Sequence, residues 1–438
     1  MGQERGQSRR SRHRRRGIKP LFWLVGLPLL LLIGLAGLYA FNRPASSPGI
    51  LTEAEEAFLA RHWQQPLPPQ GPPPPNFSPL EASLAPASCG TCHPQQYQDW
   101  QTSIHSQSMG PGVWGQVIDM IESDPASAQV CWSCHTPLAE QQNVLLVTSP
   151  QGEATFRPNP AFDAALQQQG LVCAACHVRK HQRFGPPRRT TPAVTGRING
   201  NLPHGGFMAE TAFTKSAFCR GCHQFGADGF ALNGKLLENT YQEWQQSSYP
   251  DQGIACQDCH MPERRHLWRG IHDPEMVKRG VTITVDVPEK RYKKGETLEA
   301  IITVANTGVG HYFPTYVTPK VFVRGHLLTS EGTVLPETAQ EAIIGREVTL
   351  DLSQELYDTR IPPGESSSFA YRQTLPRDRL QLRVEVVVAP DHFYTRFFAA
   401  TLNDGGGGKG RSLLVKALEN ARRSPFTIYV QTIPLYVP

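Results

Sequence analysis

Every cysteine in this chain belongs to a Cys-x-x-Cys-His motif, and ten cysteines make five such motifs. Two thiols three residues apart lie on one side of a helical turn, where they can form thioethers with one porphyrin, and the adjacent His can bind the iron. A disulfide framework or a zinc site would not require a His directly after every second cysteine. The pattern therefore predicts five covalently bound haem c groups, attached at Cys89/Cys92, Cys131/Cys134, Cys173/Cys176, Cys219/Cys222 and Cys256/Cys259, with iron ligands His93, His135, His177, His223 and His260.

Each haem iron has a second axial position, and the ligand there is a main determinant of the reduction potential. Of the 15 histidines, five lie in the motifs and two lie near the N-terminus, which leaves eight. An electron carrier with two His on every iron would use five of these eight. His266 and His272 both follow the last motif closely and compete for one place, whereas His326 and His392 lie on or just after a predicted strand and are expected to be structural. The second ligands that we expect are His105, His181, His204, His272 and His311.

Local sequence supports individual candidates. His204 lies in Leu-Pro-His-Gly-Gly, where the glycines allow the backbone to approach a porphyrin closely. His181 follows His177 by four residues, a spacing that makes the two neighbours on a helix, so His181 would bind a different haem. Three methionines are possible alternative ligands, although Met is also common packing material: Met109, Met208 and Met261.

The motif region, residues 88–279, is short for the number of haems that it must hold. The motifs start 42, 42, 46 and 37 residues apart, which is a loose repeat and not a solenoid period. Five porphyrins in fewer than 200 residues must supply much of the buried apolar surface. We therefore expect a haem-packed core wrapped by short helices and long loops, with little sheet.

The sequence changes character at Val281, where alternating apolar segments separated by Pro and Gly turns begin. These segments predict an antiparallel β-sandwich of immunoglobulin-like type. The C-terminal part predicts a helix over 412–422 and a strand within 426–437. The predicted strands of the sandwich cover 281–285, 298–304, 320–328, 347–352, 367–371 and 380–388.

The N-terminus predicts a membrane anchor. Residues 1–19 hold seven Arg and one Lys against one Glu, and the 22 uncharged residues of 20–41 are long enough for one transmembrane helix. Basic flanks stay on the cytoplasmic side, so the remainder of the chain would be periplasmic. A cleaved signal peptide is the rival interpretation, but its apolar core is usually shorter. A helix over 51–63, capped by Thr52, and a Pro-rich run at 66–75 would form a connector that either extends away from the bilayer or packs on the haem region.

These observations give a multidomain fold class: a mostly α/loop multihaem cytochrome c domain, an antiparallel sandwich and one transmembrane helix. The expected divisions are a cytoplasmic segment 1–19, an anchor 20–41, a connector 42–87, a pentahaem domain 88–279, a β-sandwich 280–403 and a C-terminal helix and tail 404–438.

The distribution of charge limits the classes of partner that the chain is expected to bind. The chain has a net charge of +5, but residues 1–19 contribute +7, which leaves −2 for the remainder before the haem propionates are counted. An acidic exported region argues against nucleic acid as a partner. It favours attraction to basic redox proteins.

Three segments resemble multihaem cytochromes related to hydroxylamine oxidoreductase and its tetrahaem electron acceptor. Residues 89–105 read as a haem motif followed by Tyr-x-x-Trp and then Ser-x-His, and in that family pattern the last His, here His105, is a distal haem ligand. Residues 241–262 are similar to another recurring piece of these proteins. Gly-His-Tyr-Phe-Pro-Thr at 310–315 resembles a motif on an appended sandwich domain, whose His, here His311, reaches back to a haem. Hydroxylamine oxidoreductase carries eight haems, whereas this chain has five motifs.

The expected function is an electron relay through closely packed haems, mostly with two His per iron, between a membrane-side donor and a periplasmic or outer-membrane acceptor. Two alternatives stay open. One is an oxidoreductase in which one open iron acts on a small nitrogen or sulfur compound, and the other is a quinol dehydrogenase anchored in the inner membrane by one helix. Since no motif replaces its His by the Lys of classical pentahaem nitrite reductases, an electron carrier is favoured over a catalytic reductase.

Overall fold

The computed structural model describes residues 51–148, 154–190, 195–198, 202–289 and 291–436. The chain divides into two compact units, residues 1–47 and 48–438, and every described residue belongs to the second. The predicted cytoplasmic segment 1–19 and the predicted anchor 20–41 lie outside the described residues. Within the described part, no helix is both long and apolar enough to cross a membrane.

The connector begins with the predicted helix. Helix α2 (Glu53–His62) starts at Thr52, whose side chain accepts a hydrogen bond from the backbone N–H of Glu55, while the Glu55 carboxylate accepts one from the N–H of Thr52. This reciprocal capping box satisfies two backbone donors that the first turn leaves free. The connector then packs along residues 88–279, the haem region. Leu67 is buried against Trp100, and the side-chain amide of Gln65 donates to the carbonyl of Ser133. The described connector therefore packs on the haem region.

Short helices carry the five motifs, as expected for a chain that wraps its cofactors. The first motif begins in the last turn of α4 (Pro86–Gly90), the second ends α7 (Pro125–His135), and the third forms α9 (Cys173–His177). The last four residues of the fourth motif form α10 (Arg220–His223), and the fifth motif forms α12 (Cys256–His260). The other helices of this region are α3 (Pro79–Ala82), α5 (Pro94–Gln101), α6 (Pro111–Ser123), α8 (Ala164–Gln167), α11 (Thr240–Gln245) and α13 (Pro274–Gly280).

The region holds more β-structure than the sequence indicated, in strands of two to five residues. They form two hairpins, β1–β2 and β7–β8, and a small sheet of order β3-β4-β6-β5. Their bounds are β1 Val144–Thr148, β2 Ala154–Pro158, β3 Val178–Arg179, β4 Gln182–Gly185, β5 Gly196–Ile198, β6 Phe207–Ala209, β7 Ala231–Leu232 and β8 Lys235–Leu236.

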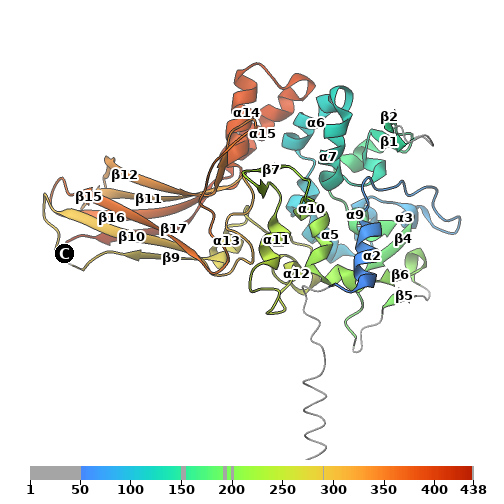
Figure 1. Cartoon of the computed structure of the whole chain (residues 1–438), viewed down its shortest axis with the longest axis horizontal. Coiled ribbons are helices and arrows are strands. Elements are labelled where there is room, and N and C mark those ends of the chain that lie inside the picture. Colours follow the sequence, from blue (N-terminus) through green and yellow to red (C-terminus); the bar gives the residue numbers. More distant parts are fainter. Residues whose placement is uncertain (1–50, 149–153, 191–194, 199–201, 290, 437–438) are drawn as a thin grey trace, which may run out of the picture. The chain divides into compact units, whose positions relative to one another are not determined.

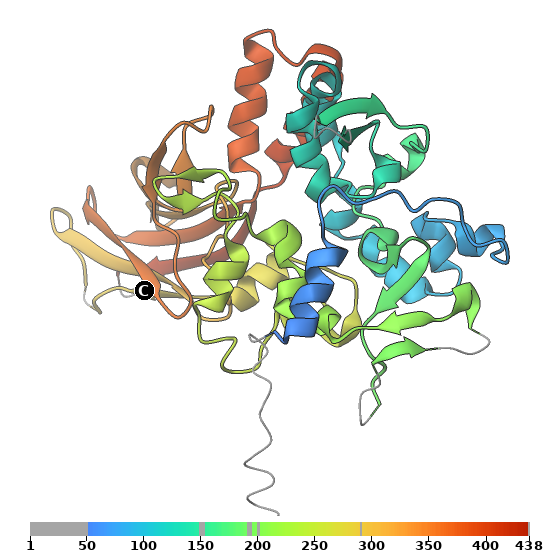
Figure 2. The same cartoon turned by 45° about the vertical axis from the view of Figure 1, so that its right-hand side comes forward.

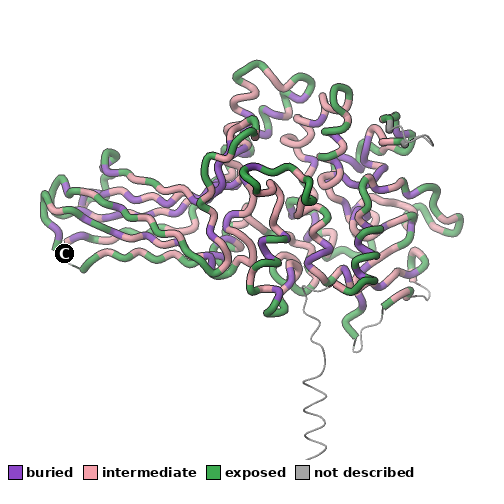
Figure 3. Tube along the Cα trace, viewed as in Figure 1, coloured by how far each residue is buried: buried purple, intermediate pink, exposed green. Residues whose placement is uncertain are grey.

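Two larger antiparallel sheets follow and share one core (Figure 1). Apolar residues alternate with more exposed ones along their central strands β10 and β16, which Figure 3 shows as a change of colour from residue to residue, so each sheet buries one face. The buried sides of both sheets meet in a single cluster. One sheet has the order β15-β10-β9 and the other β12-β11-β16-β17. The strands are β9 Val281–Asp286, β10 Thr297–Asn306, β11 Lys320–Thr329, β12 Val334–Ile344, β15 Ser366–Thr374, β16 Leu380–Ala389 and β17 Phe426–Pro434.

Two helices near the C-terminus return to the haem region (Figure 2). Helices α14 (His392–Asn403) and α15 (Arg411–Arg423) pack against α6, where the absence of side chains at Gly112 and Gly115 makes room for Phe398 and Leu414. A Cβ at Gly115 would lie 2.9 Å from Leu414, so a larger residue would push the helices apart. The chain therefore leaves the haem region and comes back to it.

From Val281 on, every predicted strand and helix overlaps an observed one, with one partial error. The predicted strand 347–352 is wrong in its second half, because β13 (Arg346–Val348) ends in a turn before β14 (Glu355–Asp358). Strand β12 and helix α14 were not predicted. Polar and charged residues interrupt the apolar alternation of β12, and α14 follows a strand with few local signals for a helix start, since its first residue has no side-chain cap.

Candidate haem sites

Four of the five motif histidines are oriented by a hydrogen bond from Nδ1. The acceptor is the carbonyl oxygen of Ser108 for His135 at 2.7 Å, of Phe184 for His177 at 2.8 Å and of Arg269 for His260 at 2.6 Å. For His223 the partner is the hydroxyl of Tyr316 at 2.8 Å. Such contacts fix the ring orientation and leave Nε2 for a metal, which is the usual outer-shell arrangement of metal-binding histidines.

Burial keeps these rings neutral, the form that binds a metal. Burial lowers the pKa of His177 to about 4, with further effects from His266 and other neighbours. It lowers the pKa of His223 to about 4 as well, with smaller effects from His260 and His135. A neutral imidazole whose Nδ1 is already engaged fits an iron ligand.

Three motif histidines face a second histidine at a distance that fits one iron between them. The ring centres lie 6.4 Å apart for His105 and His223, 6.2 Å for His177 and His266, and 6.4 Å for His260 and His311. Two imidazoles that bind one metal through nitrogen at about 2 Å place their ring centres roughly 6 Å apart. Each pair therefore has the separation of a haem iron with two axial His.

Two of the second members of these pairs are oriented by a hydrogen bond from Nδ1, as the motif histidines are. Nδ1 of His266 donates to the carbonyl of Arg264 at 3.0 Å, and Nδ1 of His311 donates to the carbonyl of Tyr312 at 2.9 Å. The buried Nδ1 of His105 has no hydrogen-bond partner among the described residues. His105 therefore has the ring separation of a second ligand but lacks the orienting hydrogen bond of His266 and His311.

His204 lies near the first motif. Its Nδ1 donates to the carbonyl of Gly206 at 2.9 Å, and its backbone N–H donates to the carboxylate of Glu81 at 2.7 Å. Burial lowers the pKa of His204, and His93 is among the neighbouring groups that add to this effect. A φ of 50° at His204 is uncommon for a residue with a side chain, and such conformations gather at functional sites.

His135, like His93, differs from the other three motif histidines. Within the described ranges, no ring contact joins either ring to a second imidazole. Tyr394 on α14 lies near the second motif: burial raises the pKa of its phenol, and the neighbouring Cys131 thiol adds to the effect. The second motif therefore offers a site with one His and a nearby phenol.

The structure places the two remaining predicted ligands elsewhere. Nε2 of His181 donates to the carbonyl of Gly71 at 2.9 Å, and the residue lies in the turn between β3 and β4 with a φ of 59°, so the helix that would have made it a neighbour of His177 is not formed. Nε2 of His272 lies 3.0 Å from the carboxylate of Asp391, and its side chain is 43% exposed. His266, the rival of His272, is the one that faces a motif histidine.

Contacts between thiols of different motifs show which sites adjoin. The Cys89 thiol interacts with that of Cys173, the Cys134 thiol with that of Cys222, and the Cys219 thiol with that of Cys256. Cys176 also lies near Cys219 and Cys222. The motifs are thus neighbours in the order first, third, fourth and fifth, with the second beside the fourth.

Other donor sets are less consistent with the geometry. No disulfide joins any of the ten cysteines, all of which lie in the described part of the chain. Among the described residues, no three His, Cys, Asp or Glu side chains converge as ligands of a metal ion. The paired imidazoles and paired thiols instead fit covalently attached haems, whose irons take the histidines from opposite sides.

Sequence reasoning did not identify the residues that orient the rings. Ser108 provides the carbonyl that accepts from His135, and its hydroxyl donates to the carbonyl of His135 at 2.8 Å. Tyr316 has a φ of 65°, and its hydroxyl meets both His223 and the buried carboxyl of Glu238. No local pattern marks these residues, because their partners are far away in the chain.

Parts of this chain are similar to known proteins. Residues 88–155, which include the first two motifs and His105, match the family described as cytochrome c554 and c-prime. Cytochrome c-552 of Parabacteroides distasonis is 24% identical over 179 residues, or 40% of this chain, and the matched part spans 33% of that relative's length. The crystal structure of a penta-heme cytochrome c552 from Thermochromatium tepidum covers 82% of this chain and 100% of its own, with a TM-score of 0.55 and 19% identity, so it shares the fold. The motifs, the family match and the relative together support covalently bound haem c of the multihaem cytochrome type.

Proposed function

We propose that this chain is a membrane-anchored periplasmic cytochrome that relays electrons through five haem c groups. The observation that carries the proposal is the set of three imidazole pairs with ring centres 6.2–6.4 Å apart. An iron with two protein ligands does not readily bind a substrate, whereas it exchanges electrons with little rearrangement. The chemistry belongs to the haem, and the protein sets ligation, spacing and exposure.

The proposed axial ligands come from distant parts of the chain. His223 pairs with His105, His177 with His266, and His260 with His311. His204 lies near His93 and completes the first site. His272 and His181 are omitted from this set, because hydrogen bonds to Asp391 and Gly71 occupy the nitrogens that would bind iron.

The proposed path of electrons follows the neighbouring thiols. It runs from the first haem to the third, fourth and fifth, with the second haem as a branch beside the fourth. Cys92 of the first motif and Cys259 of the fifth are exposed, whereas both cysteines of the third and fourth motifs are at least half-buried. The exposed ends favour exchange with partner proteins at the first and fifth haems.

The membrane anchor and the periplasmic location rest on the N-terminal sequence. The roughly eleven residues between the predicted anchor and α2 extend at most about 40 Å. Helix α2 packs on the third motif, where Nε2 of His62 donates to the carbonyl of Cys176 at 2.8 Å and Nε of Arg179 donates to the carbonyl of His62. We also propose that the two sheets after Val281 are an immunoglobulin-like sandwich.

The second site favours an additional activity. Since no imidazole among the described residues is in ring contact with His135, its iron would keep an open position, and Tyr394, near Cys131 of the same motif, would be the proton donor. We propose that this iron binds a small nitrogen or sulfur compound, such as nitrite or hydroxylamine.

Electron paramagnetic resonance of the oxidised protein tests both parts, after mass spectrometry has established that five haems are attached. We expect four low-spin ferric signals and one high-spin signal that changes on addition of nitrite or hydroxylamine. Five low-spin signals without a response would overturn the open site and leave the relay. Several high-spin signals would overturn the proposed ligand pairs.

A further inference from the structure

One loop reaches the axial ligands of two different sites. The loop is residues 310–316, the central part of the connection between β10 and β11. Its His311 faces His260 of the fifth motif, and its Tyr316 meets Nδ1 of His223 of the fourth motif. The position of this single segment therefore affects two neighbouring irons.

Helix α11 holds the loop at three points. A Cβ at Gly310 would lie 3.2 Å from the indole of Trp244, so glycine permits a close approach there. The backbone N–H of Tyr312 donates to the carboxylate of Glu243 at 3.1 Å, and the hydroxyls of Thr240 and Thr315 lie 2.7 Å apart. These contacts come from one face of a short helix that lies between the fourth and fifth motifs.

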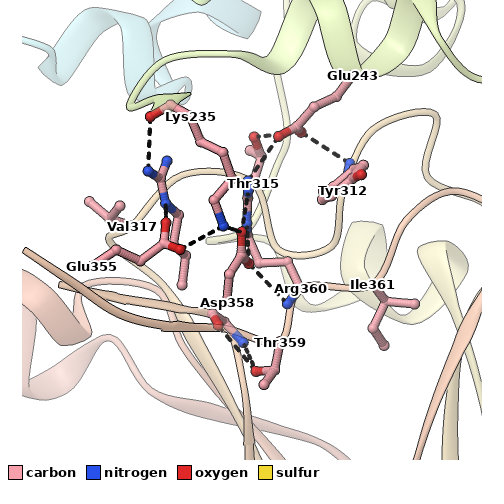
Figure 4. A network of polar contacts seen from close by, with 12 residues as sticks. Lys235, Glu243, Tyr312, Thr315, Val317, Glu355, Asp358, Thr359, Arg360 and Ile361 are labelled. Carbon is pink, nitrogen blue, oxygen red and sulfur yellow. Dashed lines mark hydrogen bonds and ion pairs between the residues drawn. The ribbon is translucent and has the colours of Figure 1, made fainter. Parts of the chain in front are cut away.

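Glu243 is in turn fixed by a buried cation. Nη1 of Arg360 donates to the Glu243 carboxylate at 2.8 Å, and the two side chains are only 5% and 4% exposed. Arg360 also binds Asp358, which binds Lys235 at 2.7 Å (Figure 4). Next to Arg360, the backbone of Ile361 pairs with that of Phe313 inside the loop. A buried charge without its partner is strongly unfavourable, so Arg360 holds the Glu243 side chain in place.

We infer that the Glu243–Arg360 ion pair is a positioning device that sets His311 on the fifth haem and Tyr316 against the ligand of the fourth. This inference rests on the proposed pairing of His260 with His311. Glu243 and Arg360 bind no haem themselves, and they act through the loop. A pair that merely joined two parts of the fold would affect stability and leave both irons unchanged.

The test compares Glu243→Ala with His311→Ala and with the wild type, using full-length protein that carries five haems. We expect Glu243→Ala to convert one further iron to high spin, as His311→Ala does. We also expect Glu243→Ala to shift the reduction potential of the fourth haem, because Tyr316 moves as well, whereas His311→Ala leaves Tyr316 in place. Arg360→Lys retains a cation beside Glu243 and should restore much of the low-spin signal relative to Arg360→Ala. Glu299→Ala is the matched control, because it breaks an exposed ion pair with Arg372 in the same region.

The outcomes separate the inference from the function on which it rests. If His311→Ala gives a high-spin iron and Glu243→Ala gives only a lower melting temperature, the positioning role is refuted and the ligand assignment stands. If His311→Ala leaves all signals unchanged, the ligand assignment itself fails. Should Glu243→Ala yield no haem-loaded protein, Glu243→Gln, which keeps the size and one acceptor oxygen, is measured by the same criteria.

Discussion

The imidazole rings of His260 and His311 lie 6.4 Å apart between centres and only 12° from parallel. His260 ends a haem-attachment motif, whereas His311 lies in the loop between β10 and β11. The β-sheets that follow the motif region are therefore more than an attached module, since they deliver one of the residues that face a motif histidine.

Replacing His311 by Ala should leave five haems attached and convert one iron from low to high spin. The thioethers depend on the cysteines, whereas the spin state depends on the second axial ligand. Electron paramagnetic resonance at low temperature measures the change. His326→Ala on β11 is the control, and it should leave every signal unchanged because that ring takes part in none of the three imidazole pairs.

His266 and His272 can be separated by the same measurement. His266→Ala should produce a high-spin iron at the third motif, because His266 faces His177 at 6.2 Å. His272→Ala should change no spin state, since it loses only a half-exposed contact with Asp391. A high-spin iron in the His272 variant, with none in the His266 variant, would reverse the assignment.

Tyr316→Phe should raise the reduction potential of the fourth haem without changing its spin state. The substitution removes the hydroxyl that meets Nδ1 of His223, and a less basic imidazole stabilises ferric iron less. A tenfold effect, at the low end for outer-shell contacts, equals about 59 mV for a one-electron couple. Potentiometric titration monitored in the visible range would detect this shift, and unchanged midpoint potentials would contradict it.

Acid should weaken the ion-pair network through Asp358. Burial raises the pKa of this carboxyl, but hydrogen bonds and ion pairs with Arg360 and Lys235 lower it more, so the pKa falls from an ordinary 3.8 to about 2. A pKa that is lower in the folded state contributes stability above pH about 4, and this contribution is lost as the pH falls through 2.

Asp358→Asn should therefore destabilise the protein near neutral pH by about 1–3 kcal/mol, the cost of leaving a buried partner unsatisfied. The difference in melting temperature between wild type and variant should stay constant above pH 4 and shrink between pH 4 and 2. Calorimetry across this range is the measurement. A difference that grows with acid would show that another group dominates, and Glu299→Gln controls for surface charge.

The sequence predicted the haem motifs and most long strands because both are local patterns. Cys-x-x-Cys-His lies within five residues, and β10 and β16 alternate buried and more exposed positions along most of their length. The partner of each motif histidine does not follow from such a local pattern. His105 follows the first motif but faces His223 of the fourth, and no spacing rule indicates this pairing, because it depends on how the motifs gather around their cofactors.

The same limit explains the choice between His266 and His272. The two histidines are six residues apart in one loop. Asp99 holds His266 in place, because its carboxylate accepts hydrogen bonds from the backbone N–H of His266 and from the Arg265 guanidinium. Burial of Asp99 raises its pKa, but the bond with Arg265 is the largest influence and lowers it overall. A contact between residues so far apart in the chain leaves no local trace.

The pairing of His105 with His223 has a consequence for how the protein is made. In the proposed export of the chain from its N-terminus, His105 emerges before the motif whose iron it faces, whereas His311 emerges after the motif that it serves. Each newly attached haem must therefore wait with one protein ligand until a later segment arrives, or must recruit one that is already outside. Maturation therefore ends only when the strands beyond the final motif have formed and have brought His311 to His260.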